Sequence, residues 1–213
     1  MWRSVSLAVL AAGLIGCADD AIPKNIGASG PEKPSLQVSV QWSPDNNAPY
    51  LLNGDRILRI HATEDQAFEV FARPKNGFDF FEESPITGDE YVAKGWQSGI
   101  ESFGVLSLRN KVVLAMYTLD YTSADQLSEK VRQYQEAFST IEPSVLPGDK
   151  ASYWFWEVGR VRLMICASQD TKRKQQLVIA LGDTDVMDAL RMSPDSARLD
   201  LVEARLKAGE RSL

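Results

Sequence analysis

The sequence predicts an α+β fold in which a mostly antiparallel β-sheet, built from hairpins, is packed by about three helices. Three observations predict this class. Apolar and polar residues alternate over 36–42, with the period of a half-buried strand. Turn-forming residues separate three pairs of apolar runs, as in β-hairpins. In the second half of the chain, capping residues precede apolar stripes with helical spacing. Because strands dominate the first part and helices come later, we expect helices to cover at least one face of the sheet.

The N-terminal residues have the pattern of a secretory signal. Arg3 provides a basic start, and the apolar run over 5–15 is too short for a membrane-spanning helix of about 20 residues. This run leads into the sequence Leu14, Ile15, Gly16 and Cys17. The pattern resembles the lipobox of bacterial lipoproteins. The resemblance implies a signal peptide at 1–16 that is cleaved after Gly16, with thioether lipidation of Cys17 and acylation of the new amino terminus by chains such as palmitate.

A flexible tether is expected from the lipidated Cys17 to residue 35. This stretch lacks hydrophobic periodicity and contains three prolines and two glycines, a composition typical of linkers. The anchor we expect is therefore lipid alone, with the cell envelope as the location. Ala18, rather than Asp, follows Cys17, and by resemblance to bacterial lipoproteins this favours the outer membrane of a cell that has one, at its periplasmic or surface face.

The remaining residues, 36–213, are expected to form a single α+β globular domain. The full chain has 23 basic and 29 acidic residues and a net charge of −6. Removal of Arg3 with the signal leaves 22 basic and 29 acidic residues, a net charge of −7. An acidic chain does not favour nucleic acid as a partner. Once Cys17 is lipidated, Cys166 is the one thiol left, so an intramolecular disulfide is excluded and the hydrophobic core must supply the stability.

Apolar runs bounded by turn residues predict the strands. The expected strands cover 36–42, 50–52, 57–60, 68–71, 105–108, 112–119, 153–157, 161–167 and 177–181. Asn53 and Gly54 give the clearest hairpin signal, because both residues tolerate positive φ. The second hairpin is expected to turn at 109–111, and the third at Val158 and Gly159.

Three helices are expected. The first begins at Ser123, with Gln126 completing a capping box, and Pro143 ends it. The second begins near Thr184. The third has Ser193 as its N-cap, followed by Pro194 at the first helical position. The apolar stripes are Leu127, Val131, Tyr134 and Phe138 in the first helix, and Leu199, Val202 and Leu206 in the third.

The stretches 108–114 and 157–163 both join a tight turn to an apolar strand. They suggest two halves of a duplication. The alternative, which we favour, is that hairpins share turn chemistry without common descent.

The sequence lacks a catalytic, cofactor or metal signature. His61 is the single histidine, which excludes sites that need two imidazoles. Cys166 follows the run 163–165 and is expected to be buried, and no Gly-x-Ser-x-Gly motif occurs. The acidic residues of 79–90 could supply oxygen ligands for Ca²⁺, but their spacing does not match an EF-hand. We expect a solvated loop there, no cofactor and no catalysis.

The aromatic run 153–156 is the strongest candidate for ligand contact. Alternation places Trp154 and Trp156 on one face of a strand. The structural interpretation is a core strand covered on both faces, and the functional one is an aromatic surface for a ligand. A second candidate is the basic tip Lys172, Arg173 and Lys174. A solvated hairpin tip is the favoured interpretation, but on a membrane-tethered domain these residues could meet anionic headgroups at about 1 kcal/mol per charge.

These observations predict a membrane-anchored envelope lipoprotein with a non-catalytic binding or scaffolding domain, whose partners are the membrane and an envelope protein. The alternative is a glycan-, lipid- or peptide-binding module that uses Trp154 and Trp156. An exposed apolar patch would favour the first, and a concave aromatic pocket the second.

Overall fold

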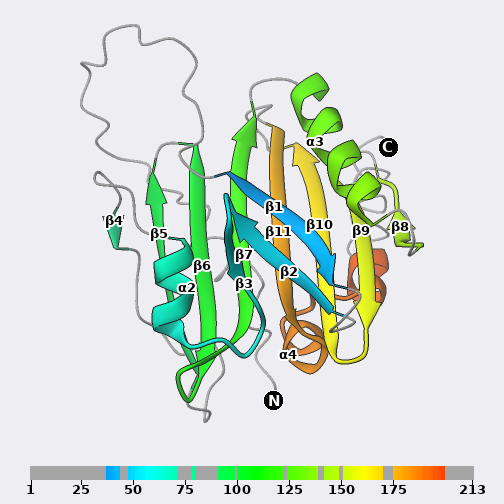
Figure 1. Ribbon diagram of the computed structural model, residues 1–213. Helices are drawn as coiled ribbons and strands as arrows, with labels where there is room; N and C mark the ends of the chain where they lie inside the picture. Colours follow the sequence, from blue (N-terminus) through cyan, green and yellow to red (C-terminus); the bar gives the residue numbers. More distant parts are fainter. Residues whose placement is uncertain are drawn as a thin grey trace, which may run out of the picture.

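The computed structural model describes residues 37–43, 48–71, 78–79, 91–98, 100–121, 124–138, 142–148, 151–169 and 175–199. The expected signal peptide, Cys17, the tether and the basic tip at 172–174 lie outside these residues. The described part confirms an α+β fold that is mostly antiparallel sheet (Figure 1).

Two antiparallel sheets make up the fold. The smaller sheet has the order β1-β2-β3, formed by Val38–Ser43, Ala48–Asn53 and Arg56–Leu58. The larger sheet has eight strands in the order β4-β5-β6-β7-β11-β10-β9-β8. Its strands are β4 Phe78–Asp79, β5 Tyr91–Ser98, β6 Glu101–Leu108, β7 Lys111–Tyr121, β8 Ser144–Leu146, β9 Ala151–Val158, β10 Val161–Gln169 and β11 Gln175–Asp183. The helices are α2 Glu64–Val70, α3 Ala124–Ala137, α4 Thr184–Ala189 and a further helical segment over 194–199.

The large sheet consists of two four-stranded meanders that meet where β7 pairs with β11. A helix follows each meander, α3 after β7 and α4 after β11. The two stretches compared in the sequence do not occupy equivalent places in these halves. The turn at 109–110 joins β6 to β7, whereas the turn at 159–160 joins β9 to β10, which is one connection earlier in its own meander.

The three predicted hairpins are present, and each turn contains at least one residue with positive φ. Arg109 and Asn110 have φ values of 50° and 61°, the signs that a type I′ turn requires. The first and third hairpins turn one residue later than expected: Val158 pairs with Val161, so the third loop is Gly159 and Arg160. In the first hairpin Asn53 pairs with Arg56, so the loop is Gly54 and Asp55, and Gly54 has a φ of 63°.

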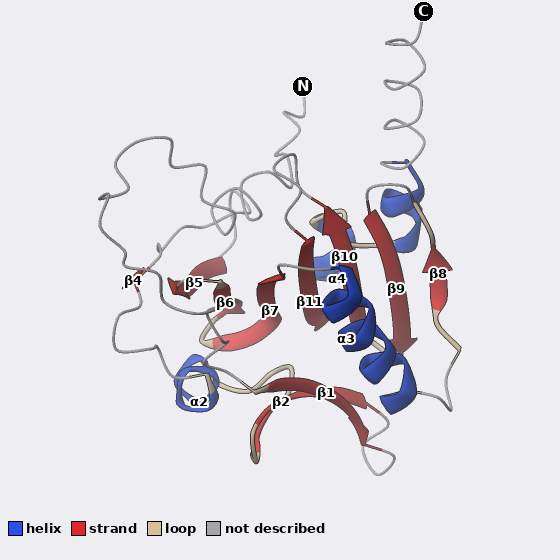
Figure 2. Cartoon of the chain, turned by 90° about the horizontal axis from the view of Figure 1, so that it is seen from above, coloured by secondary structure: helices blue, strands red, loops and turns tan. Residues whose placement is uncertain are grey.

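Both faces of the large sheet are covered (Figure 2). The small sheet, α2 and α3 lie over one face, and α4 and the segment 194–199 lie over the other. On the first face a buried cross-strand row runs through the centre of the core, formed by Trp96, Phe103, Tyr117, Ile179 and Ile165. The row continues into β9 beside α3, where the candidate site lies.

The strand expected over 68–71 is wrong, because this part of the chain forms the helix α2 and its C-cap. Thr63 is the N-cap: its Oγ1 accepts a hydrogen bond from the backbone N–H of Gln66 at 3.2 Å, and the Gln66 side chain accepts one from the Thr63 N–H at 2.9 Å. This capping box, together with burial of Ala67 and Val70 on one face, outweighs the β-propensity of the aromatic and branched residues nearby.

The other helices agree with the sequence in most respects. The expected stripe of α3 is buried at all four positions, while the expected cap Ser123 lies outside the described residues. Ser193 caps the last helix, because its Oγ accepts a hydrogen bond from the Ser196 N–H at 3.2 Å. Leu199 was expected on an apolar stripe, but it is 59% exposed, and Ala197 is buried instead.

Candidate functional site

The two tryptophans of β9 have different surroundings. Both side chains lie on the face that α3 covers, as alternation predicts. Trp156 is 1% exposed, and the ring of Phe138, which follows α3, lies 5.1 Å from it between centroids. Trp154 is half-buried. The expectation that Trp156 contacts a ligand is therefore wrong, because the end of α3 covers it.

Trp154 lines a hollow of about 360 Å³ between α3 and the sheet. We call this hollow the Trp154 groove. From the sheet, Ser152 and Trp154 of β9 contribute together with Ala167 of β10 and Gln175 of β11. Ser152 and Ala167 are cross-strand partners. All four residues occupy the alternate positions whose side chains lie on the sheet face that α3 covers.

The opposite wall is one side of α3. Leu127 and Val131 belong to its buried stripe. Ser128, Arg132 and Gln135 also line the groove, and their spacing of four and three residues places them along one flank of the helix. The wall is therefore apolar toward the core and polar toward the surface.

The apolar surface continues from Trp154 to the edge of the sheet. Val145 of β8 is the cross-strand partner of Trp154, so both side chains leave the same face. Val145 is 46% exposed. It gives the groove an open apolar margin at the side of β8.

The charge of Arg132 is compensated on α3 itself. Its guanidinium donates two hydrogen bonds to the Glu129 carboxylate, at 2.9 and 2.7 Å, and one to Glu136. The hydrogen bond from Arg132 is the main reason that the pKa of Glu129 is lowered, and those carboxylates raise the pKa of Arg132. Among the described residues that line the groove, Arg132 is the one formal charge, so this lining is nearly neutral.

Cys166 is buried and chemically protected. It lies on the opposite face of the sheet, 8% exposed. Burial raises the pKa of its thiol to about 12, although a hydrogen bond with Tyr153 opposes the shift. The thiol form therefore predominates at neutral pH, which disfavours a nucleophilic role.

His61 lies at the other end of β11 from the groove. Its Nε2 is 3.1 Å from Oδ2 of Asp183, the last residue of β11, and its side chain is 59% exposed. The backbone has a φ of 70° and is held by the hydrogen bond from the His61 N–H to the Val112 carbonyl at 2.7 Å. This pair joins the segment before α2 to the sheet and is separate from the Trp154 groove.

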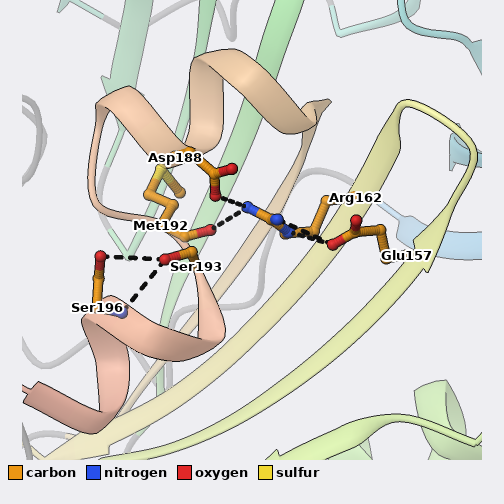
Figure 3. Close-up of polar contacts among 6 residues, drawn as sticks. All are labelled: Glu157, Arg162, Asp188, Met192, Ser193 and Ser196. Atoms are coloured by element: carbon orange, nitrogen blue, oxygen red, sulfur yellow. Dashed lines mark hydrogen bonds and ion pairs between the residues drawn. The ribbon is translucent and has the colours of Figure 1, made fainter.

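Arg162 forms an ion network with two partly exposed carboxylates on the α4 face (Figure 3). Its side chain is 6% exposed. The guanidinium donates to Glu157 of the neighbouring strand at 2.8 and 3.0 Å, to Asp188 of α4 at 2.6 Å and to the Met192 carbonyl at 3.3 Å. The Arg162 guanidinium thus has acceptors on β9, on α4 and on the turn after α4. We interpret this cluster as a structural link that attaches α4 to the sheet, not as a ligand site.

The remaining sequence candidates lie largely outside the described residues. These are the basic tip, Cys17 with Gly16, and most of the acidic stretch 79–90. Within the described ranges, no cluster of three or more His, Cys, Asp or Glu residues is arranged to hold a metal ion. None of the described helices is both long and apolar enough to cross a membrane.

The fold and the groove together define an α+β domain with one half-buried tryptophan in a nearly neutral hollow. Comparison with protein-family models, with curated proteins and with solved structures finds no match for the chain.

Proposed function

We propose that this chain is a lipid-anchored, non-catalytic binding protein of the bacterial cell envelope, and that its domain holds a ligand in the Trp154 groove. The observation that carries the proposal is the half-buried Trp154 in a hollow of about 360 Å³. Ligand pockets typically measure about 300–1,000 Å³ and combine aromatic side chains with a few polar groups. A tryptophan offers a large, rigid contact area at small entropic cost.

The described surface favours ligand binding in the groove over a scaffolding role. The described surface has three large exposed hydrophobic residues, Ile57, Val145 and Leu199. They stand on three different elements, β3, β8 and the segment 194–199, whereas a protein-binding face typically gathers apolar residues into a patch. Val145 belongs to the margin of the Trp154 groove.

The test is retention of a ligand by the full-length lipidated protein, transferred from cell membranes into lipid nanodiscs. Molecules extracted from wild type, Trp154→Ala and Ile57→Ala are compared by mass spectrometry. Ile57→Ala is the matched control, because it removes an exposed apolar side chain from β3. We expect one class of molecule to be retained by wild type and Ile57→Ala and to fall at least tenfold in Trp154→Ala. Equal retention by all three proteins, or none by wild type, would refute the proposal.

A further inference from the structure

We infer that the ligand of the Trp154 groove is an uncharged oligosaccharide of pyranose sugars. This inference rests on the proposed function and names the chemistry of its ligand. It follows from the mixture of side chains in the groove, from their charge and from the shape of the β8 edge.

The described lining is half apolar or small and half polar. The polar members are Ser128, Arg132, Gln135, Ser152, Ser168 and Gln175. A serine hydroxyl and a glutamine amide each donate and accept hydrogen bonds, and so does a sugar hydroxyl. A pyranose ring also has a face of C–H groups, which can stack on an indole ring such as that of Trp154. One ring can therefore satisfy both halves of the lining.

Charge favours a neutral ligand over an anionic one. Arg132 is the one charged residue in the described lining, and Glu129 and Glu136 already occupy its guanidinium. An anion would have to compete with two carboxylates for this group. The described lining also lacks a carboxylate that would attract a cationic ligand.

Neither an acyl chain nor an extended peptide fits as well. A hydrocarbon chain would cover Ser152 and Gln175 without offering them hydrogen bonds, which costs free energy. An extended peptide would have to add a strand beside β8, which has three residues and is flanked by Pro143 and Pro147. Such a short edge strand between prolines limits strand addition. Val145 beside Trp154 instead gives a second apolar contact, along which a chain of sugar rings can leave the groove.

The test is titration of the full-length lipidated protein in nanodiscs with two neutral probes, chitotetraose and cellotetraose. The readout is the indole N–H resonance of each tryptophan, assigned by single Trp→Phe variants. We expect at least one probe to shift the Trp154 resonance. The Trp96 resonance is the internal control and should not move, because this buried indole donates to the Phe71 carbonyl at 3.1 Å.

Variants then locate the site. Affinities of the variants are measured by isothermal titration calorimetry with the same probe, because variants at position 154 lack the Trp154 indole. Trp154→Phe keeps an aromatic face, so its affinity should stay within about threefold of wild type, and Trp154→Ala should lose at least tenfold. Gln175→Ala should lose about fivefold, and Ile57→Ala should match wild type. Binding should be the same at 50 and 300 mM salt, because a neutral ligand displaces no counterions.

Several results would overturn the inference, in different ways. If neither probe moves Trp154 but the protein from cells retains another class of molecule in a Trp154-dependent manner, the sugar assignment fails and the proposed function stands. If nothing is retained and Trp154 does not respond, both fail. Binding that disappears at high salt, or on replacing Lys172, Arg173 and Lys174 by glutamine, would also overturn the neutral-sugar assignment. Because the titration uses wild type, it remains decisive even if Trp154→Ala does not fold.

Discussion

Replacing Arg162 by alanine should weaken the attachment of α4 to the sheet. The guanidinium is 6% exposed and links Glu157 to Asp188 of α4. Burial alone would lower the pKa of Arg162, but its hydrogen bonds with Asp188 and Glu157 raise it overall. The arginine therefore stays charged in the folded state, and its substitution removes two charged interactions together.

The magnitude follows from how exposed the partners are. Hydrogen bonds to charged groups contribute about 1.5–3 kcal/mol each. The Glu157 and Asp188 side chains are 50% and 55% exposed, so water can replace the guanidinium, and each loss should lie at the lower end of that range. We expect Arg162→Ala to lower the free energy of unfolding by about 3 kcal/mol. Arg160→Ala is the matched control: Arg160 is 74% exposed and pairs with Asp185 of α4 at 2.7 Å, and such surface pairs contribute about 0–1 kcal/mol.

The assay is urea unfolding of the full-length protein in neutral detergent, followed by circular dichroism, with hydrogen exchange of the α4 amides. Arg162→Ala should lower the midpoint and speed exchange where α4 ends, at Leu190 and Met192, whose N–H groups donate to the Val186 and Met187 carbonyls at 3.0 and 2.7 Å. Arg160→Ala should change both quantities little. Equal losses in the two variants would refute the argument, because burial would then not determine the contribution.

Two further predictions concern the cysteines. Cys17→Ala should abolish metabolic incorporation of palmitate and leave the precursor uncleaved or outside the membrane fraction, and unchanged labelling would contradict lipidation at this residue. The pKa of the Cys166 thiol is raised by burial from 9.0 to about 12, so the folded state keeps its proton between these values while the unfolded state loses it. Stability should therefore fall as pH rises from about 9 to about 12: wild type should lose about 1.4 kcal/mol more than Cys166→Ala between pH 8 and pH 10. The measurement is urea unfolding of both proteins across this pH range. If the free energy of unfolding has the same pH dependence in the two proteins, the prediction is wrong.

Local patterns in the sequence predict much of the sheet but not the groove. The turn at Arg109 and Asn110 is predictable because polar residues separate two apolar runs there, although arginine does not itself favour positive φ. The sequence favours a strand over 68–71 because Phe68 and Phe71 have high β-propensity, although Thr63 and Gln66 have the same capping-box spacing as Ser123 and Gln126. In this segment the hydrogen bonds at the helix start decide the structure, not the propensity of the residues that follow.

Tertiary contacts decide the parts that the sequence leaves open. Alternation places Trp154 and Trp156 on one face, but it does not show that Phe138 covers one ring and leaves the other half-buried. The groove itself requires α3 to lie across the ends of β9, β10 and β11, and β11 begins only at Gln175, well after α3 ends at Ala137. Asp188 follows Arg162 by 26 residues, and no periodic pattern links residues at that separation.

The pairing of β7 with β11 has a consequence for the order of folding. All the residues from α3 to the β10–β11 connection lie between these two strands in the chain, so the pair forms late in synthesis or export. Until β11 arrives, the eleven-residue β7 is the open edge of the first meander. Long, unpaired edges recruit other chains, and long-range pairing slows folding. Variants that slow the docking of β11 should therefore aggregate through β7 even when the finished fold is stable.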